Sequence, residues 1–206
     1  MGKPIDPFNS KRLLYRAVEN NSEDEEFIYQ IQRDAEAQSS SSFGLLLPES
    51  KRSSNKFKEH LLERVLMSAI VCLPPDSAGQ NAEPANPTPV GIIVLNAQRK
   101  GTEHHRHSYI SIDILKPYRG KGYGAEAIEW SLGFGFQMAG LHRVGIETFT
   151  FNTGAMRLYE KLGFVLEGRK REEIWFDGEW HDYVTYGILE NEWRDKMKKE
   201  GRKWRE

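Results

Sequence analysis

Residues 119–124 read RGKGYG and place three glycines and two cations in one short stretch. The preceding residues, 108–115, have strand character, and the run that follows has helical spacing. Glycines between a strand and a helix let backbone N–H groups converge on an anion, and the helix N-terminus adds a favourable dipole. The stretch therefore predicts either a phosphate-binding loop or a structural turn.

The spacing of these glycines excludes two common phosphate motifs. A Walker loop requires a Lys-Ser or Lys-Thr pair at its end, and none follows here. Gly120, Gly122 and Gly124 give the pattern G-x-G-x-G, whereas the dinucleotide fingerprint is G-x-G-x-x-G. A hairpin-like strand pair also precedes the loop, while a dinucleotide fold starts with a parallel sheet. A turn and a different kind of phosphate loop both stay open.

The N-terminal half of the chain predicts helices between strands. Ser22 and Glu25 form a capping box ahead of apolar residues at helical spacing. The stretch QSSSSFG at 38–44 is loop-like, and Ser54 or Asn55 can cap a second helix. The expected strands are 12–18, with Leu13, Tyr15 and Ala17 on one face, then 64–73 and 90–98.

Proline and glycine define the connections of the remaining chain. The proline-rich stretch 74–89 predicts a long loop that joins two antiparallel strands, because proline lacks the donor that ladders and helices need. Asp177-Gly178 is a strong hairpin signal between the last two strands. We expect a helix after residue 124, a strand at 142–151, and a helix from Asn152 to Gly163. The order of elements indicates a mixed α/β or α+β chain around one sheet.

Composition narrows the class of protein. The net charge of −1 over 206 residues provides no basic field for nucleic acid or an anionic membrane. The only cysteine, Cys72, excludes a disulfide framework and a thiolate metal cluster. The stretch EHHRH at 103–107 predicts a polar turn, since no paired ligand set accompanies its histidines. We expect a soluble intracellular protein that has no membrane span, no metal and no nucleic-acid partner. The cytoplasm is the expected compartment, and the nucleus stays open as the alternative.

Two motifs together resemble one family. RGKGYG fits [RQ]-x-x-G-x-[GA], the pyrophosphate loop of the GNAT N-acetyltransferase superfamily. NTGAMRLYEKLGF at 152–164 is similar to the next motif of that family, N-x-x-[AS]-x-x-L-Y-x-x-x-G-F. The resemblance covers roughly residues 11–190, is strongest from 108 to 189, and is weakest from 39 to 89.

The resemblance implies a fold and a domain plan. GNAT proteins have a central, mostly antiparallel sheet of about seven strands, with the fourth and fifth strands splayed apart and about four flanking helices. The chain is then expected to form a single domain over 1–206. Its core would cover 11–190, with a loop insertion at 74–89 and a charged tail at 191–206.

The resemblance also implies acetyl-CoA as co-substrate and assigns residues to it. Backbone of the fourth strand would pair with the pantetheine arm, backbone N–H groups of the glycine loop would hold the pyrophosphate, Asn152 would contact the pantetheine end, and Tyr159 would face the thioester sulfur. The expected binding residues are Asp113, Ile114, Leu115, Arg119, Gly120, Lys121, Gly122, Tyr123, Gly124, Asn152 and Tyr159.

The implied chemistry is attack of an amine on the thioester carbonyl. Tyr159 is a suitable general acid for the leaving thiolate, because an unperturbed phenol has a pKa of about 10. The attacking amine must lose a proton, and Glu147 and Asp113 on the two splayed strands are candidates for the general base.

The motifs predict an acetyl-CoA-dependent N-acetyltransferase. The last part of the chain resembles both the ribosomal-protein alanine acetyltransferases and the spermidine/diamine acetyltransferases. The acceptor is therefore expected to be a small amine or polyamine, or a peptide or protein N-terminus. The expected partners are acetyl-CoA and this amine, and a homodimer stays open because the sequence does not determine the oligomeric state. The alternative is a non-catalytic acyl-CoA-binding or regulatory module that has kept the fold.

Overall fold

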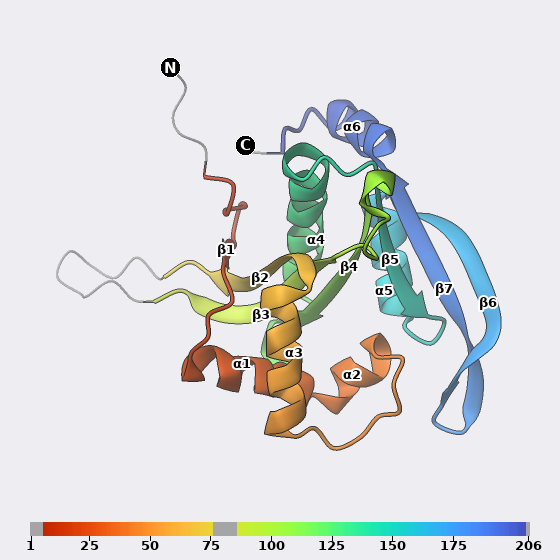
Figure 1. The fold of residues 1–206 in the computed structure, drawn as a ribbon. Helices are drawn as coiled ribbons and strands as arrows, with labels where there is room; N and C mark the ends of the chain where they lie inside the picture. Colours follow the sequence, from red (N-terminus) through yellow and green to blue (C-terminus); the bar gives the residue numbers. More distant parts are fainter. Residues whose placement is uncertain (1–5, 76–85, 205–206) are drawn as a thin grey trace.

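The computed structural model describes residues 6–75 and 86–204. Its centre is a seven-stranded sheet in the order β1-β2-β3-β4-β5-β7-β6 (Figure 1). Neighbouring strands are antiparallel except β4 and β5, which are parallel. The predicted mixed α/β fold with a mostly antiparallel sheet is confirmed. The strands are β1 (Leu14–Arg16), β2 (Val65–Leu73), β3 (Thr88–Asn96), β4 (His107–Ile114), β5 (Arg143–Phe149), β6 (Val165–Phe176) and β7 (Glu179–Leu189).

The described residues contain six α-helices rather than the expected four or so. The difference comes from a short helix in the serine-rich stretch and from a helix in the charged tail. The helices are α1 (Ser22–Gln32), α2 (Ala35–Ser41), α3 (Lys51–Glu63), α4 (Tyr123–Gly133), α5 (Thr153–Leu162) and α6 (Glu190–Lys199). Phe134–Met138 continues α4 as a π-helical turn.

The prediction of a loop at 38–44 is wrong for most of that stretch. Asp34 caps α2, since its Oδ1 accepts a hydrogen bond from the Ala37 N–H at 3.2 Å. The hydroxyls of Ser39, Ser40 and Ser41 each donate to a backbone carbonyl one turn earlier. Serine side chains often compete with helical hydrogen bonds, but here their bonds to preceding carbonyls are compatible with the helix.

Two helix starts and one strand face also differ from the prediction. Asn21 rather than Ser22 caps α1, and Ser50 caps α3, four residues ahead of Ser54. Ser54 is buried inside α3, and Ala17 is exposed beyond the end of β1. In both helices an earlier residue with a side-chain acceptor was available to cap the first turn.

The two hairpins form as predicted where the structure describes them. Asp177 and Gly178 adopt positive φ angles of 49° and 83°, as a two-residue hairpin turn requires. β2 and β3 are antiparallel, but β3 begins at Thr88 and so includes the last residues assigned to the 74–89 loop. The middle of that loop lies outside the described residues.

Helices cover both faces of the sheet. Alternate residues of β3 point to opposite faces, so Ile93 packs with α4 and α5 while Ile92 packs with α1 and α3. The helical members of the first core include Ala127, Ile128, Tyr159 and Leu162, and those of the second are Phe27, Ile28, Ile31 and Leu61. α2 contributes to neither core.

β4 and β5 separate soon after they start. Their pairing covers only His107 with Arg143, Ser108 with Val144, and Tyr109 with Gly145. β4 nevertheless continues to Ile114 and β5 to Phe149. The sheet is therefore open between these two strands, as the splayed pair in the prediction requires.

Candidate functional site

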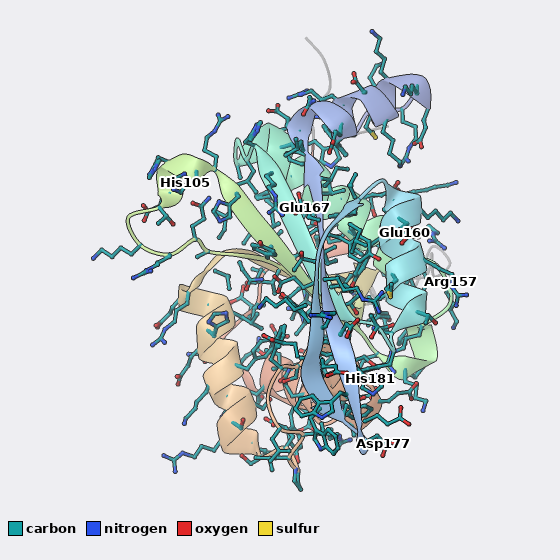
Figure 2. The ribbon with its side chains drawn as sticks, turned by 90° about the vertical axis from the view of Figure 1, so that its right-hand side faces the viewer. His105, Arg157, Glu160, Glu167, Asp177 and His181 are labelled. Carbon is teal, nitrogen blue, oxygen red and sulfur yellow. The ribbon has the colours of Figure 1, made fainter. Side chains whose placement is uncertain are left out.

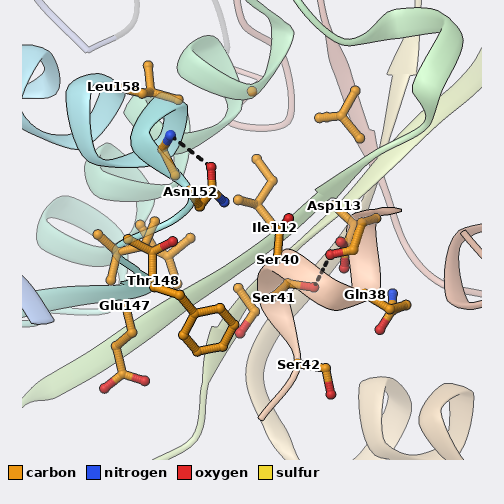
Figure 3. A pocket seen from close by; sticks show the side chains of 18 of the residues that line it. Gln38, Ser40, Ser41, Ser42, Ile112, Asp113, Glu147, Thr148, Asn152 and Leu158 are labelled. Carbon is orange, nitrogen blue, oxygen red and sulfur yellow. Dashed lines mark hydrogen bonds between the residues drawn. The ribbon is translucent and has the colours of Figure 1, made fainter. Parts of the chain in front are cut away.

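A cavity of about 620 Å³ lies where β4 and β5 have separated (Figure 3). Its walls include α2 and Phe57 of α3 from one face of the sheet, and α4 and α5 from the other face. The cavity therefore passes through the sheet between the two strands. Its polar lining residues include Gln38, Ser40, Asp113, Glu147, Asn152 and Tyr159.

The glycine loop borders this cavity through Arg119 and Gly124. Gly120 and Gly122 have positive φ angles of 73° and 83°, and Gly122 is the N-cap of α4. Within the described part of the chain, the backbone N–H groups of residues 120–125 have no hydrogen-bond acceptor, and the Glu126 N–H is the first to bond, to Gly122 O at 3.1 Å. Free N–H groups at the start of a helix can bind an anion.

The two cations of the loop are placed differently. The Arg119 guanidinium donates to the Ile114 carbonyl at 2.8 Å and to Asp34 Oδ2 at 2.6 Å. Its charge is thus already paired with the residue that caps α2. Lys121 is exposed, with its ammonium 5.5 Å from the centre of the Tyr118 ring. Lys121 is the loop cation whose charge is not neutralised by a carboxylate in the described residues.

An N-terminal contact that the sequence did not predict supports the loop from outside. Arg12 pairs with Glu126 at 2.7 Å, and its Nη1 donates to the Lys121 carbonyl at 3.0 Å. The Arg12 N–H and the Ser10 hydroxyl also donate to Glu126, each at 2.7 Å. These partners lie more than a hundred residues apart in sequence, so no local pattern indicates them.

Asn152 and Tyr159 lie on α5 and line the cavity. Asn152 caps the helix as predicted, accepting from the Ala155 N–H at 3.1 Å, and Gly163 ends it with a φ of 97°. Tyr159 is 7% exposed. Burial raises the pKa of its phenol, and the nearby Asp113 and Tyr186 raise it further, so the hydroxyl stays protonated at neutral pH.

The two candidate bases face the cavity from different strands. Asp113 is half-buried on β4, and burial raises the pKa of its carboxyl to about 6, although Arg119 opposes the shift. Glu147 on β5 points away from Asp113 and Asn152 (Figure 3). Burial raises the pKa of the Tyr183 phenol, and its hydrogen bond with Glu147 adds to the shift. Of the two, Asp113 is the carboxylate that interacts with Tyr159.

Close backbone contact fixes the position of Asp113. A Cβ on Gly91 of β3 would lie 2.4 Å from the Asp113 carbonyl oxygen. Only glycine therefore allows β3 and β4 to approach at this point. Sequence reasoning did not single out Gly91, because a glycine inside a strand has several explanations.

The polar wall opposite α5 comes from α2. Gln38, Ser40, Ser41 and Ser42 line the cavity on the side away from Asn152 and Leu158 (Figure 3). Phe43 follows, with its ring centre 5.4 Å from that of Phe149 and 4.8 Å from that of Tyr183. These residues fall in the stretch expected to be a loop, and no pattern in that stretch indicates that they face the site.

The histidines of the 103–107 stretch lie away from this site. His105 belongs to a short 3₁₀ turn at Glu103–His105, at the opposite end of the view from Asp177 and His181 (Figure 2). Among the described residues, no group of three or more potential ligands could hold a metal ion. None of the helices in residues 6–75 and 86–204 has the length and apolar character needed to cross a membrane.

Comparison with known proteins gives a consistent result. The acetyltransferase (GNAT) family matches residues 56–164, just over half of the chain. The SPbeta prophage-derived uncharacterized N-acetyltransferase YokL of Bacillus subtilis (strain 168) is 37% identical over 79 residues, which is 38% of this chain and 45% of that protein. Spermidine N(1)-acetyltransferase of Vibrio cholerae serotype O1 is 32% identical over 89 residues, 43% of this chain and 51% of that protein.

The matched segments span about half the length of these two relatives. Structural similarity extends further along the chain. The crystal structure of the acetyltransferase (GNAT family) from Bacillus anthracis matches with a TM-score of 0.69 and 26% identity, covering 89% of this chain and 98% of that one.

Proposed function

The chain belongs to the acetyltransferase (GNAT) family, and from this membership we propose that it transfers an acetyl group from acetyl-CoA to a primary amine. The single observation that carries the proposal is the cavity through the sheet, which joins the free N–H groups of the glycine loop to Asp113 and Tyr159. A long ligand with an anionic end and a reactive thioester end suits this arrangement.

The residues present fit coenzyme A. Backbone N–H groups of residues 120–125, with the charge of Lys121, suit the pyrophosphate. The backbone of Asp113 and Ile114 at the end of β4 borders the opening, where a pantetheine arm can pair with it, and Leu115 follows just beyond the strand. Asn152 and Tyr159 then flank the thioester from α5.

Asp113 and Tyr159 supply the proton transfers in this proposal. With a pKa of about 6, the Asp113 carboxylate is ionised at neutral pH and accepts the proton that the ammonium must lose. The amine nitrogen forms the new bond to the acetyl carbon, the carbon–sulfur bond breaks, and Tyr159 donates a proton to the thiolate.

The two proton transfers assist each other. The negative charge of Asp113 is one cause of the raised Tyr159 pKa. When Asp113 takes up a proton, that cause disappears and Tyr159 becomes a stronger acid. The base step therefore prepares the acid step.

We infer an acceptor that arrives as a cation. Asp113 and Glu147 are the carboxylates that line the cavity, and the one arginine in its lining is already paired with Asp34. One relative is a spermidine N(1)-acetyltransferase, so a polyamine is one class of acceptor to test. A peptide N-terminus is the other, since it also presents an isolated ammonium group.

A thiol-release assay with acetyl-CoA tests the proposal. The panel would contain spermidine, spermine, alanyl and seryl peptides with free N-termini, aminosugars and free amino acids. Steady turnover with a cationic amine, together with calorimetric binding of CoA, supports the proposal. CoA binding without turnover on any amine would instead favour the acyl-CoA-binding module.

A further inference from the structure

The wall that α2 contributes to the cavity has no hydrophobic anchor. α2 has seven residues, and none of them is buried. Helices this short are marginal in water and usually depend on packing of an apolar face. Contacts at the two ends of α2 must therefore hold it against the opening between β4 and β5.

Asp34 provides the contact at the start of α2. Its Oδ1 caps the helix through the Ala37 N–H, and its Oδ2 accepts from the Arg119 guanidinium at 2.6 Å. Burial raises the Asp34 pKa, but the hydrogen bonds from Ala37 and Arg119 outweigh it and hold the pKa below its ordinary value. The carboxylate is thus charged and fully engaged between the helix and the glycine loop.

A second ion pair links the same elements but is far more exposed. Lys116 pairs with Glu36 at 2.7 Å, and their side chains are 71% and 64% exposed. The side chains of Arg119 and Asp34 are less exposed, at 30% and 17%. Exposed ion pairs contribute little because water and salt screen them. The pair of Arg119 with Asp34 is therefore the connection that fixes α2.

We propose that Asp34 is a positioning residue that, through Arg119, couples occupancy of the glycine loop to the placement of the acceptor wall formed by α2. The inference rests on the proposed function. An anion held by the N–H groups of residues 120–125 fixes the loop, and the loop fixes Arg119, Asp34 and the start of α2. CoA and the amine then favour each other's binding, and by thermodynamic linkage the effect is reciprocal.

The variant Asp34→Asn tests this coupling with little other change. Asparagine is as good an N-cap as aspartate, so α2 keeps its cap while the ion pair is lost. We expect the KM of the amine to rise by about 10-fold, because hydrogen bonds between charged groups are the stronger class. The Kd of CoA alone, measured by calorimetry, should stay within about 2-fold because the anion-binding N–H groups are unaffected.

Lys116→Ala is the matched control, since it breaks the exposed pair between the same two elements. It should change the amine KM and the CoA Kd by less than about 2-fold. The amine is whichever of spermidine or an alanyl peptide the wild-type protein acetylates faster. A double-mutant cycle of Asp34→Asn with Arg119→Gln should show that the second change adds little to the effect on amine KM.

Two outcomes would overturn the inference. One is an Asp34→Asn variant whose amine KM is unchanged, and the other is a CoA Kd that rises as much as the amine KM. Thermal unfolding of each variant reports whether the fold is intact at the assay temperature. If the wild-type protein binds CoA but acetylates no amine, the proposed function fails. In that case, spermidine binding measured with and without CoA still tests the coupling, and equal Kd values would contradict it.

Discussion

The two walls of the cavity are held in place by different forces. α4 and α5 anchor the cofactor wall with buried side chains such as Ile128 and Leu162. α2 has none, and depends on a charged contact at one end and on the ring of Phe43 at the other. Apolar packing is dense and tolerates little adjustment, whereas an ion pair and a ring contact allow small shifts. We expect the cofactor wall to be rigid and the acceptor wall to adapt.

The largest expected effect comes from the cofactor wall. Tyr159→Phe should lower kcat by about 100-fold or more, because a positioned general acid contributes on this scale. Tyr186→Phe is the control, since the Tyr186 ring centre lies 5.8 Å from that of Tyr159 and its hydroxyl bonds to Glu160. Steady-state kinetics checks both. Equal kcat values for wild type and Tyr159→Phe would remove the acid role.

Asp113→Asn should lower kcat/KM by about 100-fold and change its pH dependence. In the wild type, the rate falls below about pH 6 as the Asp113 carboxylate takes up a proton. The variant should lack this limb of the pH profile. Glu147→Gln should retain this fall in rate below about pH 6. If Glu147→Gln lost it and Asp113→Asn kept it, Glu147 rather than Asp113 would be the base.

The raised pKa of the Asp113 carboxyl also makes the free energy of unfolding depend on pH. The folded Asp113 carboxyl has a pKa of about 6, above the value of about 3.9 in an unfolded chain. The folded state therefore binds the proton more tightly, so this group's contribution to the unfolding free energy falls as pH rises from about 4 to about 6. Denaturant unfolding of wild type and Asp113→Asn across this window measures the difference. Parallel curves would contradict the shift.

Gly122→Ala tests the anion-binding end of the cofactor wall. The φ of Gly122 is 83°, and a Cβ there would lie 3.2 Å from Arg12 Nη2. Strain of about 1–3 kcal/mol should distort the loop and raise the Kd of CoA by about 10-fold. Gly101→Ala is the matched control, because Gly101 has a φ of 88° with open space around it. Similar CoA affinities for the two variants would count against the loop as the pyrophosphate site.

The smallest effect should come from a charged contact that supports the start of α4 in the cofactor wall. Glu126→Gln weakens the contacts with Arg12 and Ser10, and we expect a loss of about 1 kcal/mol in the free energy of unfolding. The Kd of CoA should change by less than about 3-fold, since apolar packing still holds α4. A larger change in CoA affinity would mean that the two walls are less different than their packing indicates.

The same contrast explains what the sequence could predict. The glycine loop and α5 are contiguous segments whose local chemistry defines them, so Gly122, Asn152 and Gly163 adopt the expected roles in turns and caps. Asp113 and Glu147 were expected near the site because the resemblance to the GNAT family implied that their two strands separate, and both residues line the cavity. The order of the strands alone did not single them out.

The acceptor wall could not be predicted in the same way. Asp34 and Arg119 lie 85 positions apart, and no local pattern connects them. The serines of α2 have low helix propensity, so their composition favoured a loop. Asp34 supports this helix with a local cap on the Ala37 N–H and with an ion pair to Arg119, and the ion pair is a tertiary contact. The support of β4 by Gly91 is likewise visible only once the two strands are side by side.

The separation of β4 from β5 also determines how molecules reach the reacting atoms. The opening lies inside the sheet rather than at its edge, with α2 lining it on one face and α4 and α5 on the other. If the protein catalyses the proposed reaction, we expect the two substrates to enter from opposite faces and each product to leave on the side from which its parent came. We then expect turnover without a fixed order of product release.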